Sequence, residues 1–209
     1  MYNKKFWDNI YKSKIVNKPS YDLWLNRYTN ILEKYKNEEI IDLGCGIGAD
    51  TLYLSEKGYK VVSCDYSEEA LKKLEEAIPK SKTIQMDISK TLPFEDVSIG
   101  LIIADLSLHY FDDKTTKNIV NEIRRVLKPN GYLIGRVNSI KDFNFGAGCG
   151  EEIEKNFYLT EAGYKRFFTK EDIQVYFSDF VIEVCEENSV LKYGNEKKAI
   201  EFMVRKHWK

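Results

Sequence analysis

A glycine-rich turn and an acid that follows it are the strongest chemical signal in this sequence. The segment Asp42-Leu43-Gly44-Cys45-Gly46-Ile47-Gly48 stands between a short apolar run and a segment with helical spacing. Glycine accepts a positive φ without steric cost and lets the backbone approach a ligand closely. Asp65 follows the glycines by about 20 positions, where a carboxylate can accept hydrogen bonds from the hydroxyls of a ribose. These residues predict a site for a ligand that contains adenosine.

The spacing of the glycines leaves the kind of ligand open. Gly44-x-Gly46-x-x-Ala49 fits the dinucleotide fingerprint, so an NAD(P)-dependent short-chain oxidoreductase is one hypothesis. The Tyr-x-x-x-Lys pattern that such an enzyme needs occurs at Tyr110–Lys114 and at Tyr193–Lys197. The first falls at a predicted loop–helix junction and the second spans a predicted hairpin turn. The same glycines could instead face the amino-acid end of S-adenosylmethionine, in an enzyme or in a non-catalytic regulator.

Four side chains are candidates for acting on a second substrate. His109 and Tyr110 follow an apolar run, and they are the candidate catalytic residues. An imidazole is a suitable base near neutral pH, and the Tyr110 hydroxyl could orient the substrate. Trp7 and Tyr11, in a predicted N-terminal helix, could close over the site and face a cation with their rings. The glycines within Phe145–Gly150 predict a mobile loop over the same region.

The elements that must position these residues alternate between strand and helix. Apolar runs and helical spacing alternate along the middle of the chain, with short connections. Strands are expected over 39–43, 60–64, 83–86, 97–104 and 132–137, and helices over 49–57, 68–78 and 114–128. This alternation is typical of an α/β domain with a parallel sheet. Two helices are expected before it, over 4–15 and 20–37, and a hairpin after it, with strands over 180–193 and 197–206 and a turn at Gly194-Asn195.

Four stretches in order resemble class I S-adenosylmethionine-dependent methyltransferases. Ile41–Gly48 is similar to the family's motif I, and Val62–Ser67 to the end of its ribose-binding strand. Gln85–Ile88 resembles the adenine-contacting segment, and Arg125–Tyr132 the helix-Pro-Gly-strand signature. The resemblance implies a Rossmann-like seven-stranded sheet with the order 3-2-1-4-5-7-6. It also implies that the last strand is antiparallel, that helices cover both faces, and that S-adenosyl-L-methionine is the cofactor.

The resemblance also assigns roles to individual residues. It implies that the backbone of Gly44 and Gly46 lies against the methionine portion and that Asp65 holds the ribose. Asp87 would bond the adenine amino group with Ile88 beside it, and Asp105 with Leu106 would face the ammonium and sulfonium. The complete expected set of cofactor-binding residues is Asp42, Gly44, Cys45, Gly46, Asp65, Tyr66, Asp87, Ile88, Asp105, Leu106, Trp7 and Tyr11.

A narrower resemblance concerns two short segments, one near the N-terminus and one before the C-terminal hairpin. Phe6–Tyr11 and Phe167–Asp172 are similar to small-molecule methyltransferases related to tellurite-resistance proteins. This resemblance implies methyl transfer to a small-molecule acceptor through oxygen, nitrogen, sulfur or a metalloid.

Composition limits the other possibilities. The 209 residues include 32 Lys and Arg against 33 Asp and Glu, so neither nucleic acid nor a membrane is an expected partner. The four cysteines lack metal-ligand spacing, so no metal site is expected. We expect these cysteines to be free thiols in a cytoplasmic protein. We expect one domain, in a monomer or homodimer. It comprises a helical cap (1–37), a cofactor-binding core (38–138) and an acceptor-side region (139–209).

Overall fold

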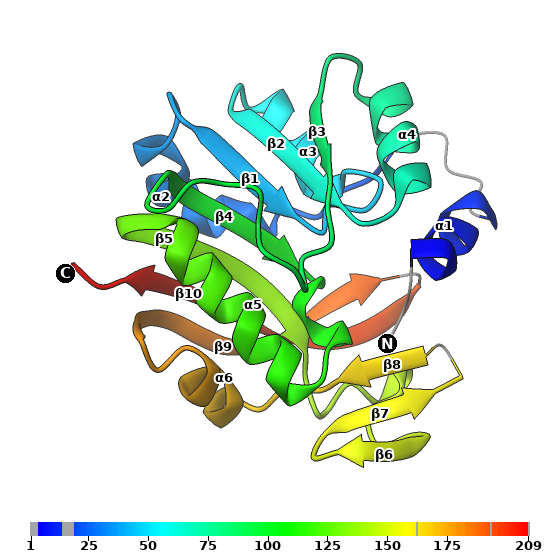
Figure 1. Cartoon of the computed structure of the whole chain (residues 1–209). Coiled ribbons are helices and arrows are strands. Elements are labelled where there is room, and N and C mark those ends of the chain that lie inside the picture. The colour runs from blue at the N-terminus through cyan, green and yellow to red at the C-terminus, as the bar shows by residue number, and fades with distance from the viewer. Residues whose placement is uncertain (1–3, 14–18, 162, 193, 209) are drawn as a thin grey trace.

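A seven-stranded sheet with the order β3-β2-β1-β4-β5-β10-β9 forms the centre of the protein (Figure 1). The computed structural model describes residues 4–13, 19–161, 163–192 and 194–208. The first five strands pair in parallel, whereas β10 is antiparallel to both of its neighbours. The predicted order and the antiparallel last strand are therefore confirmed. The strands are β1 (Glu39–Leu43), β2 (Lys60–Asp65), β3 (Lys82–Gln85), β4 (Ile99–Asp105), β5 (Leu127–Asn138), β9 (Phe180–Lys192) and β10 (Asn195–Lys206).

Helices cover both faces of this sheet. On one face lie α5 (Asp113–Val126) and α6 (Lys170–Tyr176), and on the other lie η1 (Trp24–Tyr28), α2 (Thr29–Lys34) and α3 (Ala49–Glu56). Strand β4 shows why both faces are apolar: Leu101 and Ile103 pack into one core, and Ile102 and Ala104 into the other. Further helices are α1 (Lys4–Ser13), α4 (Glu68–Ala77), η2 (Leu108–Tyr110) and η3 (Phe143–Phe145).

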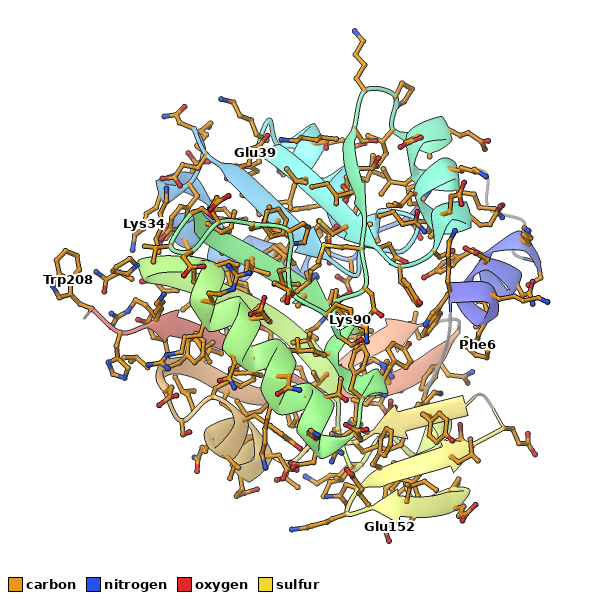
Figure 2. All side chains as sticks on the ribbon, viewed as in Figure 1. Phe6, Lys34, Glu39, Lys90, Glu152 and Trp208 are labelled. Carbon is orange, nitrogen blue, oxygen red and sulfur yellow. The ribbon has the colours of Figure 1, made fainter. Side chains whose placement is uncertain are left out.

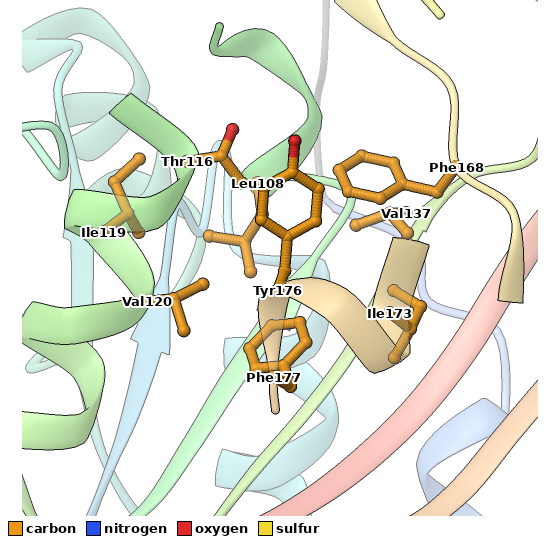
Figure 3. A pocket seen from close by; sticks show the side chains of 9 residues that line it. All are labelled: Leu108, Thr116, Ile119, Val120, Val137, Phe168, Ile173, Tyr176 and Phe177. Atoms are coloured by element: carbon orange, nitrogen blue, oxygen red, sulfur yellow. The ribbon is translucent and has the colours of Figure 1, made fainter. Parts of the chain in front are cut away.

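Side chains fill the space between these layers, whereas Trp208 projects beyond β10 and is 77% exposed (Figure 2). A cavity of about 10 Å³ remains between η2, α5 and α6, lined by apolar side chains such as Leu108, Ile119 and Phe177 (Figure 3). A space of that size holds at most one water, so it is a packing defect rather than a ligand site. Within the described ranges, no helix is long and apolar enough to cross a membrane.

Three expectations about the elements were wrong. The single helix expected over 20–37 is a 3-10 helix followed by a short α-helix, because Tyr28 leaves helical geometry at φ −104° and ψ 15°. The fifth sheet strand begins at Leu127, directly after α5, rather than at residue 132. No strand was expected between residues 150 and 180, whereas β6 (Glu151–Glu154), β7 (Phe157–Thr160) and β8 (Gly163–Arg166) form a second, three-stranded sheet.

Hydrogen bonds and one close contact connect the turns that follow β1, β2 and β4. The backbone N–H groups of Gly44 and Cys45 both donate to the Cys64 carbonyl, at 2.7 and 2.9 Å. The Ser107 hydroxyl donates to the Leu43 carbonyl at 2.7 Å. Gly44 has a φ of +79°, and a Cβ added to it would lie 2.3 Å from the Ser107 Cβ. The glycine is therefore required both by its backbone conformation and by the contact between the two turns.

This contact predicts that Gly44→Ala destabilises the protein by about 2–5 kcal/mol, from left-handed backbone strain together with overpacking. Gly58 is the matched control, because its φ is +82° but no atom lies within 4 Å of an added Cβ. Gly58→Ala is expected to cost only the strain, about 1–2 kcal/mol. Urea denaturation measures both losses, and equal losses would show that the contact between the turns adds nothing.

Candidate functional site

A crevice of about 660 Å³ opens where the parallel strands end. Its walls come from the loops that follow β1, β2, β3 and β4, from the N-terminal segment, and from β5, β8, β9 and β10. The volume lies within the range of about 300–1,000 Å³ that is usual for ligand pockets. The carboxyl ends of the strands in an open α/β sheet are the usual place for a ligand.

The structure brings nearly all the predicted site residues to this crevice. Those that line it are Trp7, Tyr11, Gly44, Cys45, Gly46, Asp65, Tyr66, Asp87, Ile88, Asp105, Leu106, His109 and Tyr110.

Asp42 lies apart from the residues that line the crevice. It is buried below the glycine turn and accepts a hydrogen bond from the Thr51 hydroxyl at 2.7 Å. Burial, with Asp105 and Asp65 nearby, raises its pKa to about 7. The Thr51 hydroxyl also bonds Ser63, at 2.8 Å. In this structure Asp42 therefore connects β1 to α3 rather than facing a ligand.

Asp65 is positioned by the backbone at the end of β2. One carboxylate oxygen accepts from the Gly46 N–H and the other from the Ser67 N–H, both at 2.8 Å. Burial raises its pKa, although these two backbone hydrogen bonds act in the opposite direction. Each carboxylate oxygen has more than one acceptor position, so both can still accept from a ligand hydroxyl.

The loop after β3 presents Asp87 and Ile88 together. One oxygen of Asp87 accepts from the backbone N–H and the hydroxyl of Ser89, at 2.9 and 2.6 Å. These bonds hold the carboxylate at the crevice wall. Ile88 beside it is 8% exposed and offers an apolar surface. A flat aromatic group with an exocyclic amine would find both a face and an acceptor here.

Helix α1 covers the glycine turn from outside, beside α4 (Figure 1). Asp8 accepts from the Ser67 hydroxyl at 2.7 Å, and Ser67 in turn caps α4 by accepting from the Ala70 N–H. The Tyr11 hydroxyl lies so close to Gly46 that a Cβ there would be 2.8 Å from it. Trp7 meets the Tyr110 ring edge-to-face with centroids 4.7 Å apart. These contacts close one side of the crevice.

An acidic end of the crevice, which we define as Asp22, Asp105 and Arg136, involves two residues that the sequence analysis missed. Arg136 is 1% exposed and donates to both oxygens of Asp105, at 2.6 and 2.8 Å, and to Asp22 at 2.8 Å. Because two carboxylates share one guanidinium, a net negative charge remains. The signal was a lone arginine within the apolar strand 132–137, which indicates a buried ion pair.

A basic end lies in the same crevice, which we define as His109, Asn138, Phe145, Lys165 and Lys197. Lys197 donates to Asp142 at 2.6 Å and lies 4.5 Å from the centre of the Phe145 ring. Lys165 donates to the Phe145 carbonyl at 3.2 Å. Burial lowers the pKa of both lysines, against the opposing charge of Asp142. The sequence analysis named neither lysine as a residue of a methyltransferase site. Lys165 was missed because it lies on β8, a strand that was not predicted.

His109 is held inside the crevice wall. The chain leaves β4 through Leu106, whose φ of +53° is unusual for a leucine, and reaches His109 three residues later. The imidazole is 3% exposed, and its Nδ1 has no hydrogen-bond partner among the described residues. Burial, together with the charges of Lys197 and Lys165, lowers its pKa well below 6.5. His109 is therefore neutral at physiological pH.

The arrangement expected of a short-chain oxidoreductase is not formed at Tyr110 and Lys114. Tyr110 ends η2, and Lys114 lies in the first turn of α5. Between them Asp112 has extended geometry and caps α5 by accepting from the Thr115 N–H at 2.7 Å. The two side chains therefore do not share one helix, as the pattern requires. The second pattern begins at Tyr193, which lies outside the described residues.

Methyltransferases are among the known proteins that are similar to this chain. Residues 41–135 match the family described as "Methyltransferase domain". A putative methyltransferase of Bacillus subtilis is 32% identical over 139 residues, covering 63% of this chain and 53% of the relative. An uncharacterised methyltransferase of Synechocystis is 32% identical over 96 residues, covering 46% and 45%. The chain thus spans about half the length of the curated relatives it matches.

Solved structures agree with this result at the level of the fold. A SAM-dependent methyltransferase from Methanosarcina mazei superposes with a TM-score of 0.74 at 23% identity, covering 86% of this chain and 98% of that one. The match to the tellurite-resistance-related group stays a prediction. Residues 41–135 therefore match the methyltransferase domain family, and the seven-stranded sheet around them has the fold of S-adenosylmethionine-dependent methyltransferases.

Proposed function

We propose that this protein transfers the methyl group of S-adenosyl-L-methionine to a small-molecule acceptor. The observation that carries the proposal is the shared lining of one crevice: the residues expected to hold the cofactor and a neutral His109 face the same space. The family of residues 41–135 supports the reaction class. The enclosed crevice and the near-neutral charge of the chain support a small acceptor rather than nucleic acid.

The residues in the crevice fit the parts of this cofactor. Gly44 and Gly46, both at positive φ, leave the backbone bare along one wall. Asp65 has acceptor positions for the ribose, and Asp87 with Ile88 suits the adenine. The net negative charge of Asp22 and Asp105 around Arg136 suits an ammonium group. In this proposal Asp105 acts on the ammonium through a charge that it shares with Asp22.

The reaction needs alignment more than it needs acid–base chemistry. When bound, the cofactor would supply an electrophilic methyl group carried by a sulfonium. The rest of the cofactor, a neutral thioether, is then the leaving group. Holding an acceptor in line with that methyl can lower the barrier by about 7–11 kcal/mol. Helix α1 excludes water from the glycine wall, and Trp7 against Tyr110 narrows the crevice. A base is needed only where the acceptor loses a proton early, and His109 is the residue placed to take it.

Asp65→Ala is expected to weaken binding of S-adenosylhomocysteine at least tenfold, about 1.4 kcal/mol. The variant removes the acceptor of both ribose hydroxyls and the carboxylate that accepts from the Gly46 N–H. Calorimetry measures the dissociation constant. Asp96→Ala is the control, since the Asp96 side chain is 74% exposed and pairs with Arg125. An unchanged constant for Asp65→Ala would contradict the ribose assignment.

His109→Ala is expected to keep the cofactor affinity and to lower turnover by about 100-fold or more, the usual range for a lost general base. Because burial lowers its pKa, wild-type turnover should be flat from pH 6.5 upward and decline only below pH 6.5, as the imidazole becomes protonated. In the variant, turnover should no longer decline below pH 6.5. Release of S-adenosylhomocysteine across a panel of acceptors measures both effects.

The matched control is His207→Ala, which changes the other histidine, an exposed one near the C-terminus. Equal turnover and an unchanged pH profile in His109→Ala would remove the base role. Cofactor binding without turnover on every acceptor would favour the non-catalytic regulator instead.

A further inference from the structure

Two ammonium groups line the basic end of the crevice, but only that of Lys197 contacts a carboxylate among the described residues. Lys165 and Lys197 both line the crevice, whereas Asp142, the carboxylate that faces them, does not. Asp142 is fully buried behind Lys197 and accepts from its ammonium at 2.6 Å. The other contact of Lys165 is a neutral carbonyl, that of Phe145. One ammonium therefore faces the crevice without a carboxylate of its own among the described residues.

Two buried polar atoms beside these lysines also lack partners. Asn138 is 1% exposed, and its Oδ1 has no hydrogen-bond partner within the described part of the chain; the same holds for His109 Nδ1. Both residues line the crevice. Leaving a buried polar atom unpaired costs about as much as a lost hydrogen bond. The wall beside the two lysines is therefore polar, which suits a polar ligand better than an apolar one.

We propose that the methyl acceptor carries an anionic group, a carboxylate or a phosphate, which pairs with Lys165 and Lys197 at the wall that His109 and Asn138 also line. The inference rests on the proposed function, because it assigns this end of the crevice to the acceptor. The cofactor also carries a carboxylate, but the residues expected to contact the cofactor lie at the glycine turn, Asp65, Asp87 and Asp105, at the ends of β1 to β4. The lysines instead come from β8 and β10, beside His109.

The test first separates this proposal from the proposed function. Calorimetry with S-adenosylhomocysteine is performed on the wild type, Lys165→Met and Lys198→Met. Lys198 is the control because it lies next to Lys197 on β10, and its ammonium contacts Ser189 and Glu196 instead of the crevice. All three proteins should bind equally well. Absence of binding by the wild type would contradict the proposed function; a tenfold loss in Lys165→Met alone would assign the lysine to the cofactor and overturn the present inference.

The second step titrates the protein saturated with S-adenosylhomocysteine with benzoate, benzamide and phenylphosphonate. Benzoate and benzamide have nearly the same shape but differ in charge. We expect the better of the two anions to bind at least tenfold more tightly than benzamide to the wild type and to Lys198→Met. Lys165→Met should lose this preference and Lys165→Arg should keep it, since hydrogen bonds to charged groups are the stronger ones.

The two anions distinguish the source of the charge: tighter benzoate indicates a carboxylate acceptor, and tighter phenylphosphonate a phosphate ester. Equal binding of benzamide and both anions, no binding of any of the three, or an anion preference that survives in Lys165→Met would each overturn the inference.

Discussion

The burial of one guanidinium is the constraint on which the site depends. Arg136 emerges from the centre of the sheet with 1% of its surface exposed, and a charge in that position must be paired. Asp105, at the end of β4, and Asp22, from the N-terminal segment, supply the pairing. The ring of Trp24 stacks over the guanidinium at 4.4 Å, and its indole N–H donates to Asp50 at 2.9 Å. The arginine thereby connects the N-terminal segment to the sheet and holds Asp22 and Asp105 at the crevice wall.

Charge of both signs is arranged within this single cavity. The acidic end, at β4 and β5, suits an ammonium, and the basic end, which includes Lys197 of β10, suits an anion. The acidic end lies between the basic end and the glycine turn that follows β1. Such an arrangement orients a ligand by its charges before its shape is matched. It also explains how a chain of net charge −1 can still present strong local fields.

The sequence predicted those features of the site that depend on the local chemistry of one or two residues. The glycine turn and Asp65 at the end of β2 follow from local chemistry, and the strand order follows from the family resemblance. The sheet β6–β8 was not foreseen because its strands are four residues long and their alternation is weak. Lys165 was missed for that reason. Arg136 and Asp22 are 114 positions apart, so their pairing appears only once the chain is folded.

Helix α1 contains no fully buried residue, although it covers the glycine turn. Its attachment consists of the Asp8 bond to Ser67, surface ion pairs such as Lys4 with Glu68, and edge contacts of aromatic rings. Exposed ion pairs of this kind contribute about 0–1 kcal/mol each. Detaching the helix therefore costs far less than unfolding the domain, and it would uncover the wall of the crevice at Gly46.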